Sequence, residues 1–221
     1  MELSRVRRTK AEARATYDRL SRAYDWVAGG SERRFRVQGL ERLNVRAGER
    51  VLEVGSGTGH ALLALARAVG EEGLACGMDL SMGMCRVARA RVGQTGANAR
   101  GVLTCGDGAT LPFPSGIFDA IFSCFTLELF DTPEIPRVLE ECRRVLKPGG
   151  RVGVVGLSLV WVGVMTWLYE RAHAWFPTVV DCRPIHVCQA MESAGFAIVD
   201  ASTGSMWGLP VETVVGVRSK E

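Results

Sequence analysis

A glycine-rich turn, Gly55-Ser56-Gly57-Thr58-Gly59, lies between two apolar segments of different periodicity. Residues 50–54 before it form a short apolar run typical of a buried strand, and residues 61–69 after it have the apolar spacing of a helix. Glycine allows positive φ angles and lets a ligand approach the backbone closely. The free N–H groups at a helix N-terminus favour an anionic ligand group. The segment is therefore either the binding turn for a nucleoside-bearing cofactor or a purely structural turn.

The spacing of these glycines, G-x-G-x-G, differs from the dinucleotide-binding pattern G-x-G-x-x-G. The chain also contains no G-x-x-x-x-G-K-[ST] phosphate loop. An acidic residue, Glu53, stands two positions before the first glycine. The pattern argues against both the dinucleotide-binding and the phosphate-loop classes.

Apolar runs and helical patterns alternate along the rest of the chain. Near-continuous apolar strands separated by helices are typical of a parallel sheet covered on both faces. We therefore expect an α/β fold with a Rossmann-like, doubly wound, mostly parallel seven-stranded sheet and helices on both faces. The expected strands are residues 50–54, 74–79, 101–105, 118–123, 151–155, 197–202 and 214–218, and the expected helices are residues 61–69, 82–92, 135–146 and 185–194.

Acidic residues stand at the ends of the second and third expected strands. Asp79 ends the second strand, 26 residues after Glu53, and Asp107 lies in Gly106-Asp107-Gly108 after the third. Ligands of doubly wound sheets bind at the carboxyl ends of the strands. A carboxylate at residue 79 can accept hydrogen bonds from two ribose hydroxyls, and one at residue 107 can accept from an adenine amino group. Capping or turn roles are the structural alternatives for both acids.

The series E-x-G-x-G-x-G, Asp79, Asp107 and Leu146-Lys147-Pro148-Gly149-Gly150 resembles the class I S-adenosylmethionine-dependent methyltransferases over residues 17–156. The segment from Tyr17 to Asp25 is similar to one that closes over the cofactor in quinone-biosynthesis methyltransferases. The resemblance implies S-adenosylmethionine as cofactor, and core packing is the alternative role for the tyrosines. It implies cofactor contacts for Tyr17, Tyr24, Glu53, Gly55, Ser56, Gly57, Gly59, His60, Asp79, Leu80, Met82, Gly106, Asp107, Gly108 and Ser123.

We expect a single domain of 221 residues. Residues 1–45 are expected to form an N-terminal helical cover and residues 46–156 the cofactor-binding core. Residues 157–221 are expected to form a cover on the substrate side together with the last strands.

Methyl transfer from a sulfonium is an in-line displacement, so the protein mainly positions the two reactants. A base is needed only where the acceptor must lose a proton. Glu128 and His186 are the candidate bases, and His173 and Asp181 are further ones. The alternative for each is a structural or solvated side chain.

The segment at residues 157–169 is unusually apolar and contains two tryptophans. Such a cover suits a small lipophilic acceptor or an approach to a membrane surface, whereas a helix packed on the core is the structural alternative. The nearest resemblance is to quinone-biosynthesis and phospholipid N-methyltransferases. Quinone enzymes carry Gly-Ile-Arg-Asn after the fourth strand, where this chain has Phe125-Thr126-Leu127-Glu128. Arg183 could pair with an anionic head group.

The net charge of +3 is concentrated at the basic N-terminus, which suits an anionic membrane surface, a nucleic acid or simply a solvated helix. A nucleic-acid methyltransferase is disfavoured because no Asn-Pro-Pro-Tyr motif is present, and a cofactor-binding protein without catalysis is a further alternative. The seven cysteines include no C-x-x-C pair, so no metal site is expected. With no apolar signal region, the expected location is the cytoplasm, with possible association at the membrane surface. The sequence makes no prediction of oligomeric state.

Overall fold

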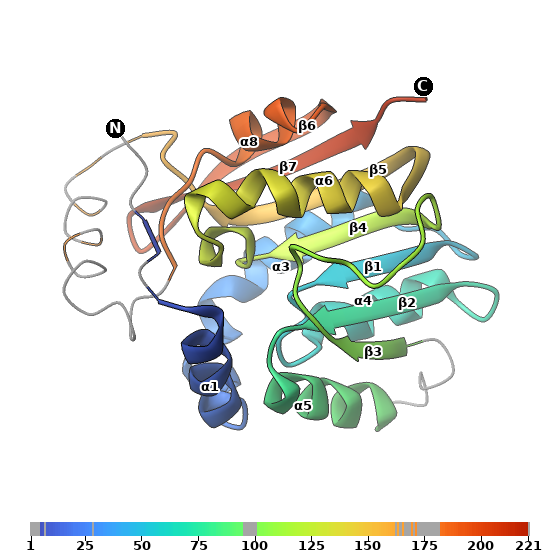
Figure 1. The fold of residues 1–221 in the computed structure, drawn as a ribbon, viewed down its shortest axis with the longest axis horizontal. Helices are drawn as coiled ribbons and strands as arrows, with labels where there is room; N and C mark the ends of the chain where they lie inside the picture. Colours follow the sequence, from blue (N-terminus) through green and yellow to red (C-terminus); the bar gives the residue numbers. More distant parts are fainter. Residues whose placement is uncertain are drawn as a thin grey trace.

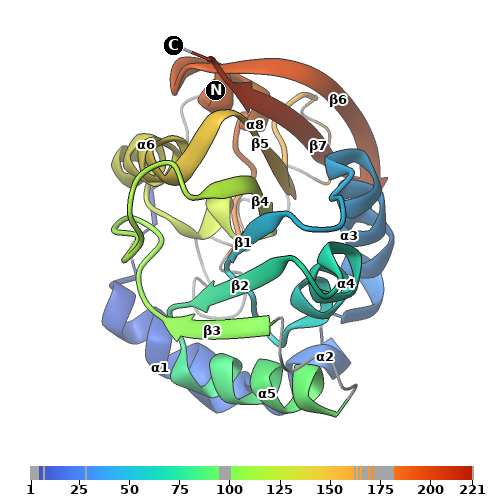
Figure 2. The same ribbon diagram turned by 90° about the vertical axis from the view of Figure 1, so that its right-hand side faces the viewer.

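The computed structural model describes residues 5–6, 8–27, 29–94, 101–161, 163, 165, 169, 171 and 182–220. Seven strands in these ranges form one sheet in the order β3-β2-β1-β4-β5-β7-β6 (Figures 1 and 2). Strand β7 is antiparallel to both neighbours, and the other pairs are parallel, which confirms the predicted fold class. The strands are β1 (Arg50–Val54), β2 (Leu74–Asp79), β3 (Gly101–Cys105), β4 (Phe118–Cys124), β5 (Leu146–Leu157), β6 (Phe196–Met206) and β7 (Leu209–Arg218).

Helices cover both faces of this sheet (Figure 2). Helices α3 (Gly29–Leu43) and α4 (His60–Val69) pack on one face, and α6 (Ile135–Val145) and α8 (Val187–Ser193) pack on the other. Each face therefore has its own hydrophobic core, which explains why β1 is buried on both sides. In α3 the backbone lies so close to the sheet that a Cβ at Gly39 would be 2.6 Å from Val155.

Three helices lie beside the β3 edge of the sheet (Figure 2). Helix α5 (Met82–Gly93) packs beside β3, and Ser81 caps it by accepting a hydrogen bond from the Met84 backbone N–H at 3.1 Å. Helix α1 (Lys10–Leu20) begins with a capping box formed by Thr9 and Glu12, and α2 (Tyr24–Val27) follows it. Because α1 buries no residue, polar contacts must hold it against the core.

The last two strands are longer than the sequence predicts. They run to a tight hairpin at Trp207-Gly208, where both residues have positive φ angles (53° and 80°). Residues 203–206 are mostly polar, and β6 is the edge strand of the sheet, so its burial alternates. Strand β5 also begins earlier than expected, at Leu146, because a register shift between Phe118 and Ala120 accommodates residues 147–150.

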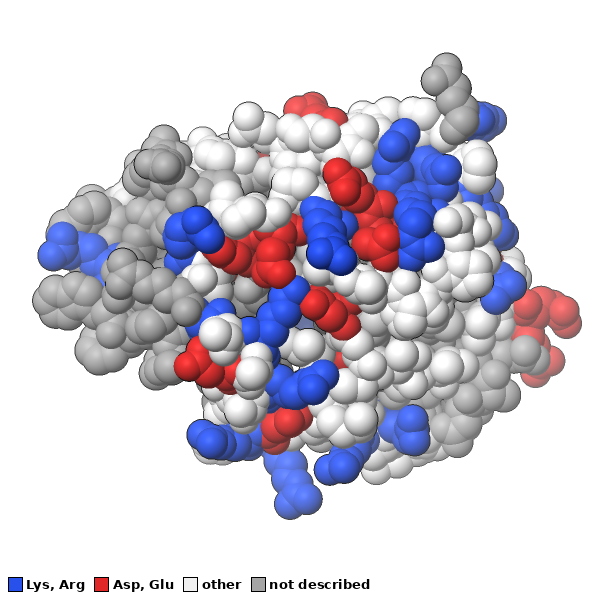
Figure 3. Space-filling view, in the orientation of Figure 1, with Lys and Arg blue, Asp and Glu red and all other residues white. Residues whose placement is uncertain are grey.

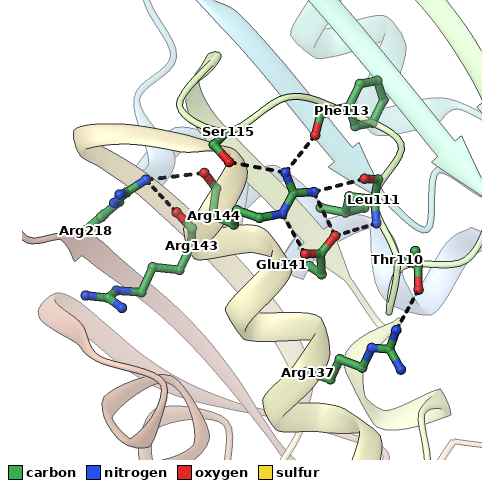
Figure 4. Close-up of polar contacts among 9 residues, drawn as sticks. All are labelled: Thr110, Leu111, Phe113, Ser115, Arg137, Glu141, Arg143, Arg144 and Arg218. Carbon is green, nitrogen blue, oxygen red and sulfur yellow. Dashed lines mark hydrogen bonds and ion pairs between the residues drawn. The ribbon is translucent and has the colours of Figure 1, made fainter.

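One arginine of α6 holds the loop after β3 through hydrogen bonds (Figure 4). The Arg144 guanidinium donates to the carbonyl oxygens of Leu111 (3.0 Å) and Phe113 (2.8 Å) and to both carboxylate oxygens of Glu141 (2.6 and 2.8 Å). Glu141 in turn accepts from the Leu111 backbone N–H at 2.7 Å. This network fixes the loop that begins at residue 106, close to the carboxyl end of the sheet.

The predicted apolar cover after β5 is described only at residues 157–161, 163, 165 and 169. The remainder of that prediction lies outside the described residues. Within the described ranges, no helix combines the length and apolar character needed to cross a membrane.

Candidate active site

A cavity lies at the carboxyl ends of β1, β2 and β3, beneath α1 and beside α3. The space that no atom fills is about 1240 Å³, including the part open to solvent. The predicted residues that line it are Tyr17, Tyr24, Glu53, Gly55, Ser56, Gly57, His60, Asp79, Leu80, Gly106, Asp107 and Gly108.

Three predicted cofactor residues lie outside the lining of this cavity. Met82 starts α5 and is 46% exposed, and Met84, two residues later, lines the cavity in its place. Ser123 lies on the opposite face of β4 from Cys124, which does line the cavity, because side chains alternate along a strand. Gly59 is the N-cap of α4 with φ of 84°, and a Cβ there would be 2.8 Å from Ala88. That glycine therefore serves the packing of α4 against α5.

The other glycines of the turn shape the cavity itself. Gly55 and Ser56 donate their backbone N–H groups to the Met78 carbonyl oxygen at 2.8 and 2.9 Å, which joins the turn to the end of β2. A side chain at Gly55 would collide with Thr126. At Gly57, where φ is 50°, a Cβ would meet nothing within 4 Å, because this residue faces the open cavity.

Asp79, at the end of β2, is hydrogen-bonded to the glycine turn that follows β1. Its carboxylate accepts hydrogen bonds from the backbone N–H groups of Gly57 and Ser81, each at 2.8 Å. Burial raises the pKa of Asp79, and the two backbone hydrogen bonds oppose that rise. Each carboxylate oxygen keeps a second lone pair with which to accept a ligand hydroxyl.

Glu53 is a second acid at the base of the cavity, and its side chain is 3% exposed. Burial raises the pKa of Glu53 well above its usual value, and the positive charge of Arg36 and a hydrogen bond from the Leu62 backbone N–H act in the opposite direction. Within the described part of the chain, its Oε2 atom has no hydrogen-bond partner.

Asp107 is held by the start of α1. Its carboxylate accepts from Lys10 Nζ at 2.6 Å and from the Ala109 backbone N–H at 2.9 Å. Lys10 also forms an ion pair with Glu134 at 2.5 Å. The lysine thus crosses the mouth of the cavity and joins the residues that follow β3 and β4.

Two further acids, Asp18 and Asp25, hold helices α1 and α2 over the glycine turn through hydrogen bonds. Asp18 accepts from the Ser81 hydroxyl (2.6 Å) and the Gly83 backbone N–H (2.8 Å), and these bonds lower the pKa of Asp18. Asp25 accepts from the Thr58 hydroxyl at 2.5 Å and also pairs with Arg91. Each acid is preceded by a tyrosine, and the rings of Tyr17 and Tyr24 lie 6.1 Å apart and line the cavity.

Helix α3 contributes two charged side chains to the cavity that the sequence did not predict. Glu32 and Arg36, one helical turn apart, both line the cavity, and Phe35 next to them is buried against Phe125 with ring centroids 6.3 Å apart. A buried aromatic residue flanked by charged residues at i and i+4 spacing was the available signal.

The candidate bases do not line the cavity. Glu128 is fully buried, and its Oε1 accepts a hydrogen bond from the Leu157 backbone N–H at 3.1 Å. His186 is the N-cap residue of α8 and is half-buried. His173 and Asp181 lie outside the described residues.

Arg183 is also fully buried, and its Nη2 donates to the Phe130 carbonyl oxygen at 2.8 Å. Burial lowers the pKa of Arg183, whereas the negative charges of Asp131 and Glu128 raise it. The Nε and Nη1 atoms have no acceptor among the described residues. Within the same residues, no group of histidine, cysteine or acidic side chains could hold a metal ion.

Comparison with known proteins places this geometry in a family. A family model described as "Methyltransferase domain" matches residues 51–150. The ubiquinone/menaquinone biosynthesis C-methyltransferase UbiE of Paraburkholderia phytofirmans is 33% identical over 168 residues, which are 71% of this chain and 66% of that protein. This chain belongs to the class I S-adenosylmethionine-dependent methyltransferases. Its cofactor is S-adenosylmethionine.

Two further comparisons define the extent of the likeness. UbiE of Paraburkholderia xenovorans is 35% identical over 66% of this chain, so the chain spans 66% and 58% of the two relatives, less than two thirds of either. The crystal structure of the [4+2]-cyclase SpnF superposes with a TM-score of 0.78 at 20% identity, covering 97% of this chain and 98% of that one. At that identity the superposition shows the shared fold alone.

The residues present fit this cofactor. The cavity has open space at Gly57 that a side chain would fill, and a half-buried acid, Asp79, with free lone pairs at the second strand end. It also has an unsatisfied carboxylate oxygen at Glu53. A cofactor with ribose hydroxyls and an ammonium group supplies the donors that these acids lack.

Proposed function

We propose that this chain transfers the methyl group of S-adenosylmethionine to a small lipophilic acceptor by in-line displacement. The observation that carries the proposal is the single cavity that unites the glycine turn, Asp79 and Asp107 beneath α1 and α2. The likeness to UbiE proteins, named as quinone-biosynthesis C-methyltransferases, supports an acceptor of the quinol type.

In this proposal each polar residue at the strand ends binds a different part of the cofactor. Asp79 binds the two ribose hydroxyls through the oxygens that also hold Gly57 and Ser81. Asp107 accepts from the adenine amino group, and Leu80 and Met84 flank the base with apolar surface. Tyr17 and Tyr24 cover the cofactor from the side of α1 and α2.

The bound sulfonium supplies an already activated methyl group. The work of the protein is therefore to align the acceptor with it and to keep water out. The contacts of Lys10, Asp18 and Asp25 hold the cover over the cavity, so these residues contribute by closing the site.

An acceptor that is a phenol or a carbon acid must also lose a proton. We propose Glu128 for that role ahead of His186, because its neighbour Leu129 lines the cavity and its carboxylate is fixed at the end of β5. On the same side, Arg183 has two N–H donors without partners among the described residues, which suits an oxygen of the acceptor.

The alternative acceptor is a phospholipid of the phosphatidylethanolamine type, methylated on nitrogen at a membrane surface. Exposed tryptophans support it: Trp161 is 43% exposed after β5 and Trp207 is 64% exposed in the β6–β7 hairpin. Tryptophan favours the boundary between water and lipid. A nucleic-acid substrate has less support, because acidic side chains are interspersed with the basic ones on the face around α1 and α6 (Figure 3).

The test is a transfer assay with methyl-labelled S-adenosylmethionine and separate pools of quinols, phosphatidylethanolamine vesicles and water-soluble phenols, amines and thiols. The proposal predicts label in the organic extract of the quinol pool, and less label when Asp79→Ala replaces the wild type at a subsaturating concentration of S-adenosylmethionine. Label in the phospholipid supports the alternative. Transfer only to water-soluble acceptors contradicts a lipophilic substrate.

A further inference from the structure

The hairpin that joins β6 and β7 holds an exposed tryptophan in an unfavourable backbone conformation. Trp207 is 64% exposed, and its φ of 53° lies in the left-handed region, which bulky side chains rarely adopt. Two-residue hairpin turns with positive φ at both positions favour Asn-Gly or Asp-Gly, whereas this chain has Trp207-Gly208. An indole so exposed adds little packing to the fold. The fold itself therefore gives no reason for a tryptophan at this position.

A second apolar segment lies against this turn. Ser158, the residue after β5, donates its backbone N–H to the Pro210 carbonyl oxygen at 2.8 Å, so the chain leaves β5 beside the hairpin. A Cβ at Gly208 would be 2.9 Å from Met165 Cγ, so Met165 contacts the turn itself. We call the exposed apolar side chains of the two segments the tryptophan patch, which consists of Val160, Trp161, Met165 and Trp207.

The tryptophan patch lies at the same edge of the sheet as the cavity. Leu157, the last residue of β5, pairs with Val211 of β7, so the hairpin turn lies beyond the carboxyl end of β5. The cavity lies at the carboxyl ends of the neighbouring parallel strands. The hairpin and α1, which covers the cavity, are at the same end of the molecule (Figure 1). A flat surface that contacts the patch therefore also faces the end of the molecule that holds the cavity.

The charge around the tryptophan patch suits an anionic surface. Residues 152–169 and 201–211 contain no charged side chain. Arg34 of α3 donates to the Ser205 carbonyl oxygen near the hairpin turn, and its neighbour Arg33 is exposed. Glu212, the first acid after the turn, is buried and accepts from the Ser158 hydroxyl at 2.6 Å. Exposed tryptophans bordered by arginines are typical of a surface that enters the boundary between water and an anionic bilayer.

We propose that the tryptophan patch docks this protein on an anionic lipid bilayer. Trp161 and Trp207 enter the region between head groups and acyl chains, and Arg33 and Arg34 contact lipid phosphates. A two-residue turn is a protruding feature that can insert between head groups, whereas a stable protein interface needs a broad complementary face. The inference rests on the proposed function, because a lipophilic acceptor would reach the cavity from the bilayer.

Co-sedimentation of the full chain with vesicles tests the docking. The vesicles contain phosphatidylcholine with or without phosphatidylglycerol, and the first variant is Trp207→Asn. Because Asn-Gly is a favoured hairpin turn, this substitution removes the indole without disturbing the hairpin. Binding to the anionic vesicles is expected to weaken roughly tenfold, and Trp161→Ser should have an effect of similar size. Arg33→Gln should weaken binding about fivefold on the anionic vesicles and leave binding to phosphatidylcholine alone unchanged.

Val102→Ser is the matched control, because Val102 is an exposed apolar residue near the start of β3, at the opposite edge of the sheet. It is expected to bind vesicles as the wild type does. Wild-type protein that does not bind anionic vesicles would overturn the inference, and so would equal binding by Trp207→Asn. A wild-type dimer that Trp207→Asn converts to a monomer, with no vesicle binding, would assign the patch to a second copy of the chain.

Methyl transfer separates this inference from the proposed function. Trp207→Asn should methylate a quinol embedded in anionic vesicles more slowly than the wild type does, while its affinity for S-adenosylhomocysteine stays the same. Vesicle binding without transfer to any lipophilic acceptor would overturn the proposed acceptor and leave the docking in place. Transfer to the quinol without vesicle binding would support the proposed function and overturn the docking.

Discussion

The backbone N–H of Gly57 donates to the carboxylate of Asp79 at 2.8 Å, so the glycine turn after β1 and the acid that ends β2 form one unit. The same carboxylate accepts from Ser81, the residue that caps α5. A change in either element is therefore transmitted to the other.

The glycines of the turn have different tasks, and two substitutions separate them. Gly59→Ala places a methyl group 2.8 Å from Ala88 at a φ of 84°, and we expect the free energy of unfolding to fall by about 2–5 kcal/mol in urea denaturation. Gly57→Ala adds strain alone, with an expected loss of about 1–2 kcal/mol, because nothing lies within 4 Å of the new atom. Its methyl group enters the cavity and should weaken S-adenosylhomocysteine. Equal stability of the two variants would contradict this division.

Arg144 holds the loop after β3 through hydrogen bonds, so its replacement should lower the stability of the fold and also weaken cofactor binding (Figure 4). Arg144→Met is expected to lower the free energy of unfolding by about 1–3 kcal/mol and to weaken S-adenosylhomocysteine through the loop that carries Asp107. Arg143→Met is the control, because only the backbone carbonyl of that residue takes part in the network. Matching unfolding midpoints for the two variants would show that the loop does not depend on Arg144.

The docking of the N-terminal segment should depend on pH. Arg5 hydrogen-bonds to Asp131 and lowers the pKa of that carboxyl from 3.8 to about 2. A pKa depressed by folding means that the ionised carboxylate stabilises the folded state above about pH 4, and that this contribution is lost as the pH falls towards 2. The unfolding midpoint of Asp131→Asn should lie below that of wild type at pH 7, and the two should converge near pH 2. Arg5→Met should show the same pH dependence of the unfolding midpoint. If the difference in midpoint between variant and wild type does not vary with pH, the Arg5–Asp131 pair is not its cause.

Glu128→Gln separates a structural role from a catalytic one. The amide oxygen can still accept from Leu157, but the negative charge that supports buried Arg183 is lost. We expect the free energy of unfolding to fall by about 1–3 kcal/mol. If Glu128 is the base, turnover per folded molecule also falls while the affinity for S-adenosylhomocysteine stays the same. Glu140→Gln, an exposed acid on α6, is the control, and normal turnover of the Glu128 variant would remove it as a base.

The sequence predicted the central strands well because their residues are buried on both faces, which leaves an unbroken apolar run. Asp79 and Gly57 could be predicted because the backbone geometry of a strand–turn–helix unit restricts the residue types there. Met84 was missed in favour of Met82, because a step of two residues turns a side chain by roughly 200° around the helix axis and so decides which methionine faces the cavity. The place of Arg36 in the cavity lining was also missed, because a charged residue on a helix has the same pattern whether it faces solvent or a cavity. The hairpin of β6 and β7 extends through polar residues, where strand pairing and not hydrophobicity sets the length.

The most direct measurement is the affinity of S-adenosylhomocysteine for wild type and for Asp79→Ala, determined by calorimetry at pH 7. The structure predicts binding at one site per chain in the wild type. The substitution should weaken it by about 1–3 kcal/mol through the loss of charge-assisted hydrogen bonds to the ribose. Denaturation of the variant shows whether the turn stays folded after the Gly57 contact is lost. A folded Asp79→Ala protein with wild-type affinity would contradict the assignment of this cavity as the cofactor site.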